Sequence, residues 1–190
     1  FAATMAECDR RGALALLADI PRPLLMLNVG ARWVTKRWPP GHFAKVARRA
    51  VVERGAGLAA VGAPEDRPLV DELFAALGPL PCLDLCGKTT LPGLAAVASL
   101  ADCFLSNDTG PLHLAAAAGA RVVGVYTCTD PARTGPYGPR AVAVRSCVWC
   151  APSFVKRCDR LECMDELTPD RVWPAVDRQL SARDSGTSAA

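Results

Sequence analysis

Residues 107–110, which read Asn-Asp-Thr-Gly, carry the clearest signal for chemistry in this chain. The apolar run 103–105 stops at these small polar residues, and a helical pattern of small and apolar residues, 112–118, follows. Asp108 or Thr109 can cap such a helix at its N-terminus, where free backbone N–H groups and the positive end of the helix dipole attract anions. Phosphate is the commonest occupant of such a site. Taken alone, the segment is more typical of an ordinary capped helix.

Short apolar runs alternate with helical patterns on both sides of this segment. The expected strands are 24–29, 58–61, 82–85, 103–105 and 122–125, and the expected helices are 39–53, 65–77, 91–100 and 112–118. This order predicts an α/β fold, a Rossmann-like parallel sheet with helices on both faces and ligands at the carboxyl ends of the strands. We expect one domain over residues 21–180, a linker or remnant of an interdomain segment over 1–20, and a disordered tail over 181–190.

Two small residues and a lysine follow the first expected strand, and a glycine lies at the start of the fourth expected helix. Gly30 and Ala31 leave room for a ligand after the first strand, and Gly110 lets a ligand approach the backbone at the helix start. The Lys36 ammonium group lies on a loop from which it can reach a phosphate oxygen. These types favour a site for a phosphorylated ligand.

The next two strand-end loops offer groups suited to a nucleoside. After the second strand, the carboxylates of Glu65 and Asp66 can accept hydrogen bonds from ribose hydroxyls. After the third strand, the loop around Thr89 is suited to backbone contacts with a base. Each loop alone is most simply a solvated turn before a helix, but their convergence at one sheet edge favours a nucleotide-type site.

The composition indicates a globular chain without a signal for nucleic-acid binding. The 190 residues are 51% apolar and carry a net charge of +3, and the basic side chains are scattered rather than gathered in a stripe. We therefore expect no nucleic-acid partner. The longest uncharged run, 89–101, is far shorter than the roughly 20 residues of a membrane-spanning helix. The chain begins at Phe1 without an initiator Met, and we expect it to be part of a longer protein.

Four closely spaced cysteines form a second candidate site, at Cys147, Cys150, Cys158 and Cys163. The first pair has the spacing of a metal knuckle, and the last two could complete a tetrahedral thiolate site for structural Zn or Fe. Free buried thiols are an equal alternative, and disulfides are a weaker one because the cytosol is reducing. The other cysteines have mostly apolar neighbours and are expected in the core. These are Cys8, Cys82, Cys86, Cys103 and Cys128.

Three longer segments resemble the motifs of one enzyme family. Residues 28–39 (NVGARWVTKRWP) resemble its NPGA…KRWP segment, 107–116 resemble its NDTGPLHLAAA signature, and 129–138 match its TDPARTGPYG loop. In this order they resemble glycosyltransferase family 9, the lipopolysaccharide heptosyltransferases, and the resemblance runs from about residue 20 to residue 180. The chain departs slightly at Val29, where the family often has proline.

The resemblance implies the C-terminal, donor-binding half of a GT-B enzyme, a fold of two Rossmann-like halves. Such enzymes move a heptose from ADP-heptose, or a similar nucleotide sugar, to the lipopolysaccharide inner core, with no metal or other cofactor required for the transfer. The implied location is the cytoplasm, including the cytoplasmic face of the inner membrane through peripheral association. A non-catalytic nucleotide-binding or metal-finger assembly module is the alternative function.

The resemblance also implies roles for the candidate donor-binding residues. Lys36 would contact the donor's phosphates or sugar. Asp108, Thr109 and Gly110 would hold the diphosphate, with Asp108 also near the sugar. His113, one helical turn further on, would touch the diphosphate, with simple packing on its helix as the alternative.

The remaining implied roles leave one gap. Asp66 or Glu65 would read the ribose, and the backbone near Thr89 would meet adenine. In the family, the carboxylate proposed as general base comes from the N-terminal half, which also forms much of the acceptor site. An inverting transfer needs a base within about 3 Å of the attacking hydroxyl. We therefore expect this chain alone to bind donor without catalysing transfer.

The last expected helix begins near Thr168 and contains Pro174, where a kink is expected. In GT-B enzymes the last helix often crosses back toward the other half. Trp173 or Val176 is therefore expected to be exposed as part of that contact.

Overall fold

The structure is a computed structural model, and it describes residues 7–182. Six strands form one sheet in which all neighbouring strands are parallel. They are β1 (Leu24–Asn28), β2 (Gly57–Gly62), β3 (Leu83–Cys86), β4 (Cys103–Asn107), β5 (Val122–Tyr126) and β6 (Ala141–Arg145). Their order across the sheet is β3-β2-β1-β4-β5-β6. The expected Rossmann-like parallel sheet is thereby confirmed.

Local sequence explains which strands are predictable. Strands β1, β4 and β5 are buried along their whole length, which matches their short apolar runs, because strands covered on both faces need no alternation. Strand β6 lies at the edge of the sheet, is partly exposed and was not expected from the sequence. Its run of small apolar residues ends in Arg145, which gives a weak signal.

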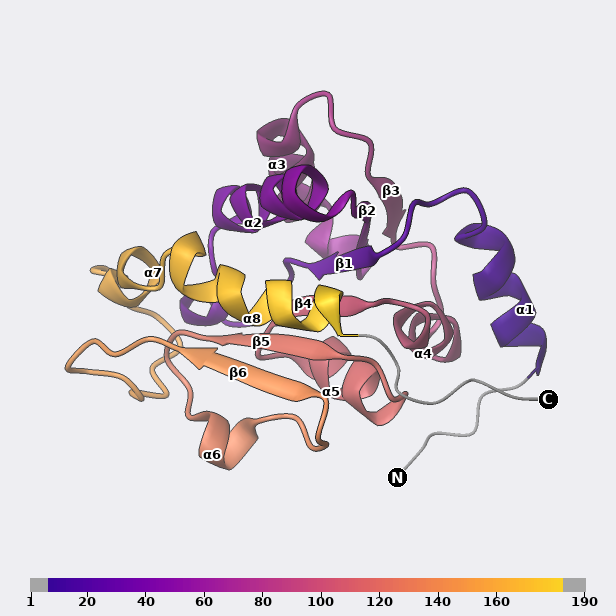
Figure 1. Ribbon diagram of the computed structural model, residues 1–190. Coiled ribbons are helices and arrows are strands. Elements are labelled where there is room, and N and C mark those ends of the chain that lie inside the picture. Colours follow the sequence, from indigo (N-terminus) through magenta and orange to yellow (C-terminus); the bar gives the residue numbers. More distant parts are fainter. Residues whose placement is uncertain (1–6, 183–190) are drawn as a thin grey trace.

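Helices cover both faces of the sheet, as Figure 1 shows. One face carries α2 (Pro40–Arg54), α3 (Arg67–Leu77) and α8 (Pro169–Ser181), and the other carries α1 (Glu7–Leu16), α4 (Leu91–Ser99) and α5 (Gly110–Ala117). The connections contain the short helices α6 (Pro131–Thr134) and α7 (Glu162–Glu166) and the 3₁₀ turns η1 (Val34–Lys36) and η2 (Pro64–Asp66). No helix among the described residues is long and apolar enough to cross a membrane.

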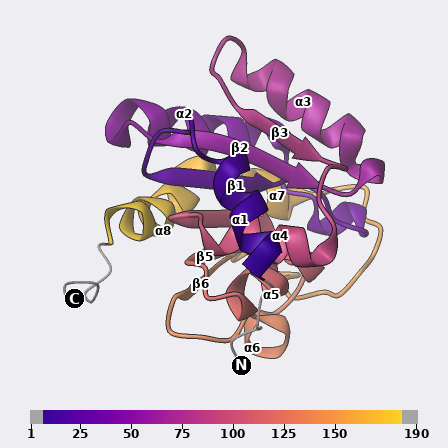
Figure 2. The ribbon, with the colours of Figure 1, turned by 90° about the vertical axis from the view of Figure 1, so that its right-hand side faces the viewer.

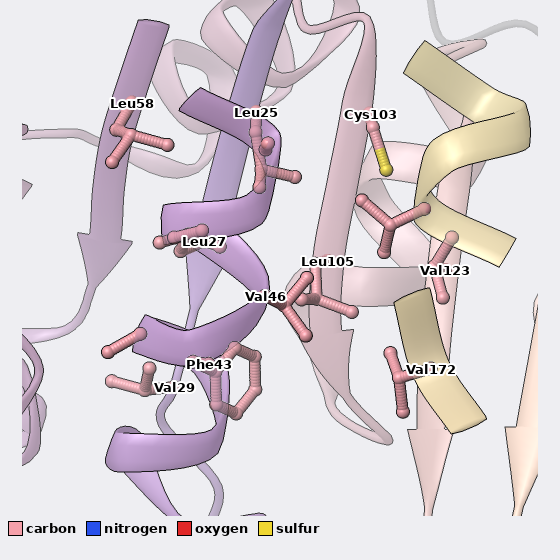
Figure 3. Close-up of a cluster of buried hydrophobic side chains, with 14 of the residues drawn as sticks. Leu25, Leu27, Val29, Phe43, Val46, Leu58, Cys103, Leu105, Val123 and Val172 are labelled. Atoms are coloured by element: carbon pink, nitrogen blue, oxygen red, sulfur yellow. The ribbon is translucent and has the colours of Figure 1, made fainter. Parts of the chain in front are cut away.

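The core on the α2 and α8 face fixes the two strands that later frame the site. Leu27 of β1 and Leu105 of β4 are fully buried there, together with Phe43 and Val46 of α2 and Val172 of α8 (Figure 3). Burying a large apolar side chain contributes about 1.5–3 kcal/mol. The carboxyl ends of β1 and β4 are therefore held on a rigid layer.

The segment expected to be a linker contains helix α1, which packs beside α4 (Figure 2). Ala13 and Leu17 are buried in the core of that face. Its role as a link to another domain stays a prediction, and residues 1–6 and the side chain of Cys8 lie outside what is described. The tail expected from residue 181 is corrected at its start, because Ser181 ends α8. Residues 183–190 of that expected tail lie outside the described part of the chain.

Helix α8 also differs from its expectation. It runs from Pro169 to Ser181 with Pro174 inside it, and the kink expected at Pro174 stays a prediction. Trp173 and Val176 are only 5% and 0% exposed, so the expectation of an exposed pair was wrong. The physical reason is that α8 packs against α2 and against β4, β5 and β6, which uses its apolar face within this domain.

Candidate functional site

A cavity of about 660 Å³ opens at the carboxyl ends of β1 and β4. The chain leaves β1 toward one side of the sheet and returns at β4 on the other, and open parallel sheets bind ligands at such a switch point. The lining consists of Asn28, Gly30, Ala31, Arg32, Trp33, Lys36, Arg37, Ala63, Glu65, Asp66, Asp108, Thr109, Gly110 and Pro111. All the expected donor-binding residues are among them except Thr89 and His113.

Three donors hold the carboxylate of Asp108 in place. Its Oδ2 accepts hydrogen bonds from Lys36 Nζ at 2.7 Å, Thr129 Oγ1 at 2.7 Å and Thr134 Oγ1 at 3.3 Å. The Asp108 side chain is only 3% exposed, and a buried charge is tolerated when it is paired and hydrogen-bonded. Asp108 therefore anchors Lys36 rather than capping α5. Both threonines belong to the 129–138 motif, to which sequence reasoning assigned no role.

The start of α5 is open to a ligand. Thr109 is the N-cap residue, but no side chain caps the helix, which corrects the expected side-chain cap. Thr109 Oγ1 instead accepts a hydrogen bond from Asn28 Nδ2 at 3.2 Å. A Cβ added at Gly110 would meet nothing within 4 Å. Because α5 begins at Gly110, two residues earlier than expected, the positive end of its dipole lies at the cavity.

Two buried asparagines tie the ends of β1 and β4 together. Asn107 Nδ2 donates to the Val29 carbonyl at 2.8 Å, and Asn107 Oδ1 accepts from the Trp38 backbone N–H at 3.1 Å. Asn28 Nδ2 donates to Ser106 Oγ at 2.9 Å, while the buried Asn28 Oδ1 has no hydrogen-bond partner among the described residues. Sequence reasoning missed both roles. The sequence signal for these roles was an asparagine at the end of an apolar strand, because a buried side-chain amide needs hydrogen-bond partners.

Gly30 lines the cavity and makes room for a neighbouring side chain, while its role in leaving room for a ligand stays a prediction. A Cβ at Gly30 would lie 2.3 Å from the carboxyl carbon of Asp66. Asp66 Oδ2 accepts a hydrogen bond from the Ala63 backbone N–H at 3.0 Å. The missing side chain thus makes room for the Asp66 carboxylate, which reaches the cavity wall from η2.

Replacing Gly30 with alanine is expected to displace the Asp66 carboxylate and break its bond to Ala63. The loss of that hydrogen bond should lower the free energy of unfolding by about 1 kcal/mol, measured by urea denaturation. Gly110→Ala is the matched control, because a Cβ there meets open space. Equal stability of the two variants would contradict this account of Gly30.

The two expected residues outside the lining have different surroundings. His113 Nε2 lies 3.5 Å from Asp108 Oδ1, but its side chain is 43% exposed and lines a neighbouring cavity with Tyr137. Thr89 is half-buried in the connection before α4, where the adjacent Thr90 caps the helix by accepting a hydrogen bond from Gly93 N at 3.2 Å. His113 is thus a neighbour of the site through Asp108, whereas the Thr89 contact with adenine stays a prediction.

The expected metal site is not assembled. Among residues 7–182, no group of three or more histidine, cysteine or acidic side chains is arranged to hold a metal ion. Cys147 is exposed, and its Sγ lies 3.4 Å from Arg171 Nη2. Cys150, Cys158 and Cys163 instead line an apolar cavity of about 300 Å³ together with the buried Cys128. Spacing alone could not reveal that Cys128, far away in the sequence, replaces Cys147 in this group. All four expected ligands are free thiols.

The environments of the cysteines predict which of them react. Cys147, Cys150 and Cys158 are exposed, whereas burial, aided by Asp84, raises the pKa of Cys82 to about 12. Since the thiolate is the reactive form, Cys82 stays protonated at about pH 8 and should react only as the pH approaches 12. Mass spectrometry after brief alkylation at about pH 8 should find the three exposed thiols modified first. Earlier modification of Cys82 would contradict the prediction.

Comparison with known proteins identifies a family. A family model described as glycosyltransferase family 9 (heptosyltransferase) matches residues 3–164. Lipooligosaccharide heptosyltransferase 2 of Campylobacter jejuni is 31% identical over 162 residues, which are 80% of this chain and 49% of that protein. The protein of the same name from Haemophilus ducreyi is 33% identical over 189 residues, which are 93% of this chain and 53% of that protein. The chain spans about half the length of the curated relatives it matches.

Solved structures share the fold. A glycosyl transferase family 9 structure from Veillonella parvula has a TM-score of 0.81 and 22% identity, covering 95% of this chain and 53% of its own. The E. coli heptosyltransferase WaaC with ADP has a TM-score of 0.66 and 23% identity. The match covers 88% of this chain and 48% of the WaaC chain. The iron-containing dodecameric glycosyltransferase TibC of enterotoxigenic E. coli has a TM-score of 0.59 and 18% identity. The match covers 86% of this chain and 49% of the TibC chain.

Proposed function

Because the chain belongs to glycosyltransferase family 9, we propose that it carries the donor-binding site of a heptosyltransferase of lipopolysaccharide core biosynthesis. The proposed donor is ADP-heptose, and the proposed acceptor is a sugar of the inner core. The observation that carries the proposal is the cavity at the switch point, which brings Lys36 and the uncapped start of α5 together. WaaC, a protein of the same fold, was solved with ADP, which supports a nucleoside diphosphate as the ligand.

The diphosphate is assigned to the start of α5 and to Lys36. An ammonium group has three donors, and Lys36 Nζ uses two of them on Asp108, at 2.7 Å to Oδ2 and 3.3 Å to the carbonyl oxygen. The third is available for a phosphate oxygen. Gly110 lets the phosphate approach the backbone, where the helix dipole favours negative charge.

The nucleoside is assigned to the side of the cavity formed by η2. Asp66 or Glu65 would accept hydrogen bonds from the ribose hydroxyls, since both line the cavity there. Adenine would then extend toward the connection that contains Thr89. The sugar would lie near Asp108 and His113, whose polar atoms are 3.5 Å apart.

In the proposed transfer, an acceptor hydroxyl attacks the anomeric carbon of the donor. The bond from that carbon to the diphosphate oxygen breaks, ADP leaves with the electron pair, and a base takes the hydroxyl proton. Lys36 and the α5 dipole stabilise the negative charge that develops on the leaving group. Asp108 is committed to three donors and serves as the anchor of Lys36. We therefore assign the base and the acceptor site to the part of the relatives' length that this chain does not span.

The transfer as proposed uses no metal or other cofactor. TibC is iron-containing, but the four thiols expected as ligands in this chain do not fit such a group, because no three possible ligands among the described residues are arranged to hold a metal ion. No step is assigned to a metal. We propose that the protein acts at the cytoplasmic face of the inner membrane by peripheral association, because its proposed acceptor is a lipid-linked sugar.

Calorimetric titration with ADP and with adenosine tests the proposal. ADP should bind more tightly than adenosine, since the diphosphate contacts are charge-assisted. Absence of ADP binding at millimolar concentration, with stoichiometric Zn or Fe in the purified protein, would instead support the alternative of a metal-finger assembly module.

A further inference from the structure

We propose that Lys156, on the Cys-rich segment 147–163, supplies a further cation for the donor diphosphate in addition to Lys36. The inference rests on the proposed function, because it adds a residue to the same site. Lys156 is 120 residues from Lys36 in the sequence, and the fold brings both lysines to the ring of Trp33.

Trp33 brings the two lysines together. Its side chain lines the cavity, and the Nζ atoms of Lys36 and Lys156 lie 4.7 Å and 5.2 Å from the centre of its ring. An ammonium group at this distance is attracted by the negative face of an aromatic ring. Lys156 is not itself a lining residue of the cavity, but it is held on the same ring as the lysine assigned to the diphosphate.

The backbone before Lys156 is fixed by hydrogen bonds. The Val155 carbonyl accepts from Thr35 Oγ1 at 2.6 Å, and Thr35 is only 2% exposed. The Ser153 and Phe154 N–H groups both donate to the Cys128 carbonyl, at 3.0 Å and 2.9 Å. Lys156 and Lys36 therefore extend from two segments that are bonded to each other directly beside the lysines.

The balanced charge of the cavity lining favours a further cation for a bound diphosphate. The lining carries three basic side chains, Arg32, Lys36 and Arg37, and three acidic ones, Glu65, Asp66 and Asp108, so its formal charge is balanced. Lys36 is in addition paired with Asp108 at 2.7 Å. A diphosphate would bring further negative charge into this neutral lining. Lys156 has no ion-pair partner within the described residues, and its charge remains available to the ligand.

Titration of ADP and adenosine into the full 190-residue chain and its variants tests the inference. Lys156→Ala should weaken ADP binding about tenfold, the equivalent of one charge-assisted hydrogen bond, and leave adenosine binding unchanged. Lys156→Arg should restore most of the ADP affinity. The matched control is Arg157→Ala, which removes the same charge from the neighbouring residue, whose side chain lines the cysteine cavity instead.

The outcomes separate this inference from the proposed function. Failure of the unmodified chain to bind ADP would overturn the proposed function itself. ADP binding that is equally strong in Lys156→Ala, or equally weakened in Arg157→Ala, would overturn only the role of Lys156.

Thr35→Val provides an independent test of how Lys156 is positioned. It removes the hydrogen bond to the Val155 carbonyl and should weaken ADP binding when Lys156 is present. In the Lys156→Ala background the same change should have little further effect, because coupled residues are not additive. Fully additive losses in ADP affinity would contradict the positioning.

Discussion

Lys36→Ala is expected to lower the affinity for ADP by about 1–3 kcal/mol, because the variant loses a charged hydrogen bond to the diphosphate. It should also lower the free energy of unfolding by about 3 kcal/mol. The reason is that Asp108, 3% exposed, keeps its buried charge but loses the ammonium group 2.7 Å away. Calorimetry with ADP and urea denaturation measure the two effects separately.

Lys45→Ala is the control for this variant, since Lys45 is exposed on α2 and does not line the cavity. Lys45→Ala should change neither the free energy of ADP binding nor the free energy of unfolding by more than about 0.5 kcal/mol. Lys36→Met, which keeps the length of the side chain but removes its charge, should behave like Lys36→Ala. An unchanged ADP affinity in both Lys36 variants, with ADP bound by the unmodified chain, would remove Lys36 from the site.

Trp38→Ala is expected to lower the free energy of unfolding by about 3–5 kcal/mol. The Trp38 side chain is fully buried, its ring contacts Phe43 edge-on with centres 5.0 Å apart, and its Nε1 donates to the Leu167 carbonyl at 2.6 Å. The substitution therefore creates a large cavity and leaves the Leu167 carbonyl without its donor. Urea denaturation followed by circular dichroism measures the loss.

Two further tryptophan variants make the measurement specific. Trp149→Ala removes a side chain that is 83% exposed and should cost less than about 0.5 kcal/mol. Trp38→Phe keeps most of the apolar volume but not the hydrogen bond, and should fall between the unmodified chain and Trp38→Ala. A similar stability of Trp38→Ala and Trp149→Ala would show that Trp38 is not a core residue.

Sequence reasoning predicted the sheet and the centre of the cavity because both depend on local pattern. A buried apolar run followed by a small polar turn and a helix places Asp108, Thr109 and Gly110 at a strand end whatever the rest of the chain does. The same logic placed Lys36 and Asp66 at neighbouring strand ends, and these residues line one cavity.

What sequence reasoning missed depends on contacts between distant residues. No local pattern shows that Thr129 donates to Asp108, that the Asp66 carboxylate occupies the space beside Gly30, or that Cys128 faces the thiols of the Cys-rich segment. The exposure expected for Trp173 failed for the same reason, since its surroundings depend on how α8 packs on α2. Periodicity identifies an apolar face but not its partner.

The bond from the Trp38 backbone to Asn107 also has a consequence for dynamics. The Asn107 side chain connects the turn after β4 to the segment that carries Lys36, and the Trp38 indole fastens that segment to Leu167, just before α8. The turn assigned to the diphosphate is therefore held to a neighbouring segment by a side chain, and the Trp38 amide that donates to Asn107 should exchange with solvent deuterium about as slowly as the amides of the central strands. A donor entering so rigid a turn orders little of it, and the conformational entropy lost on binding falls mainly on the ligand and on exposed side chains such as Lys156.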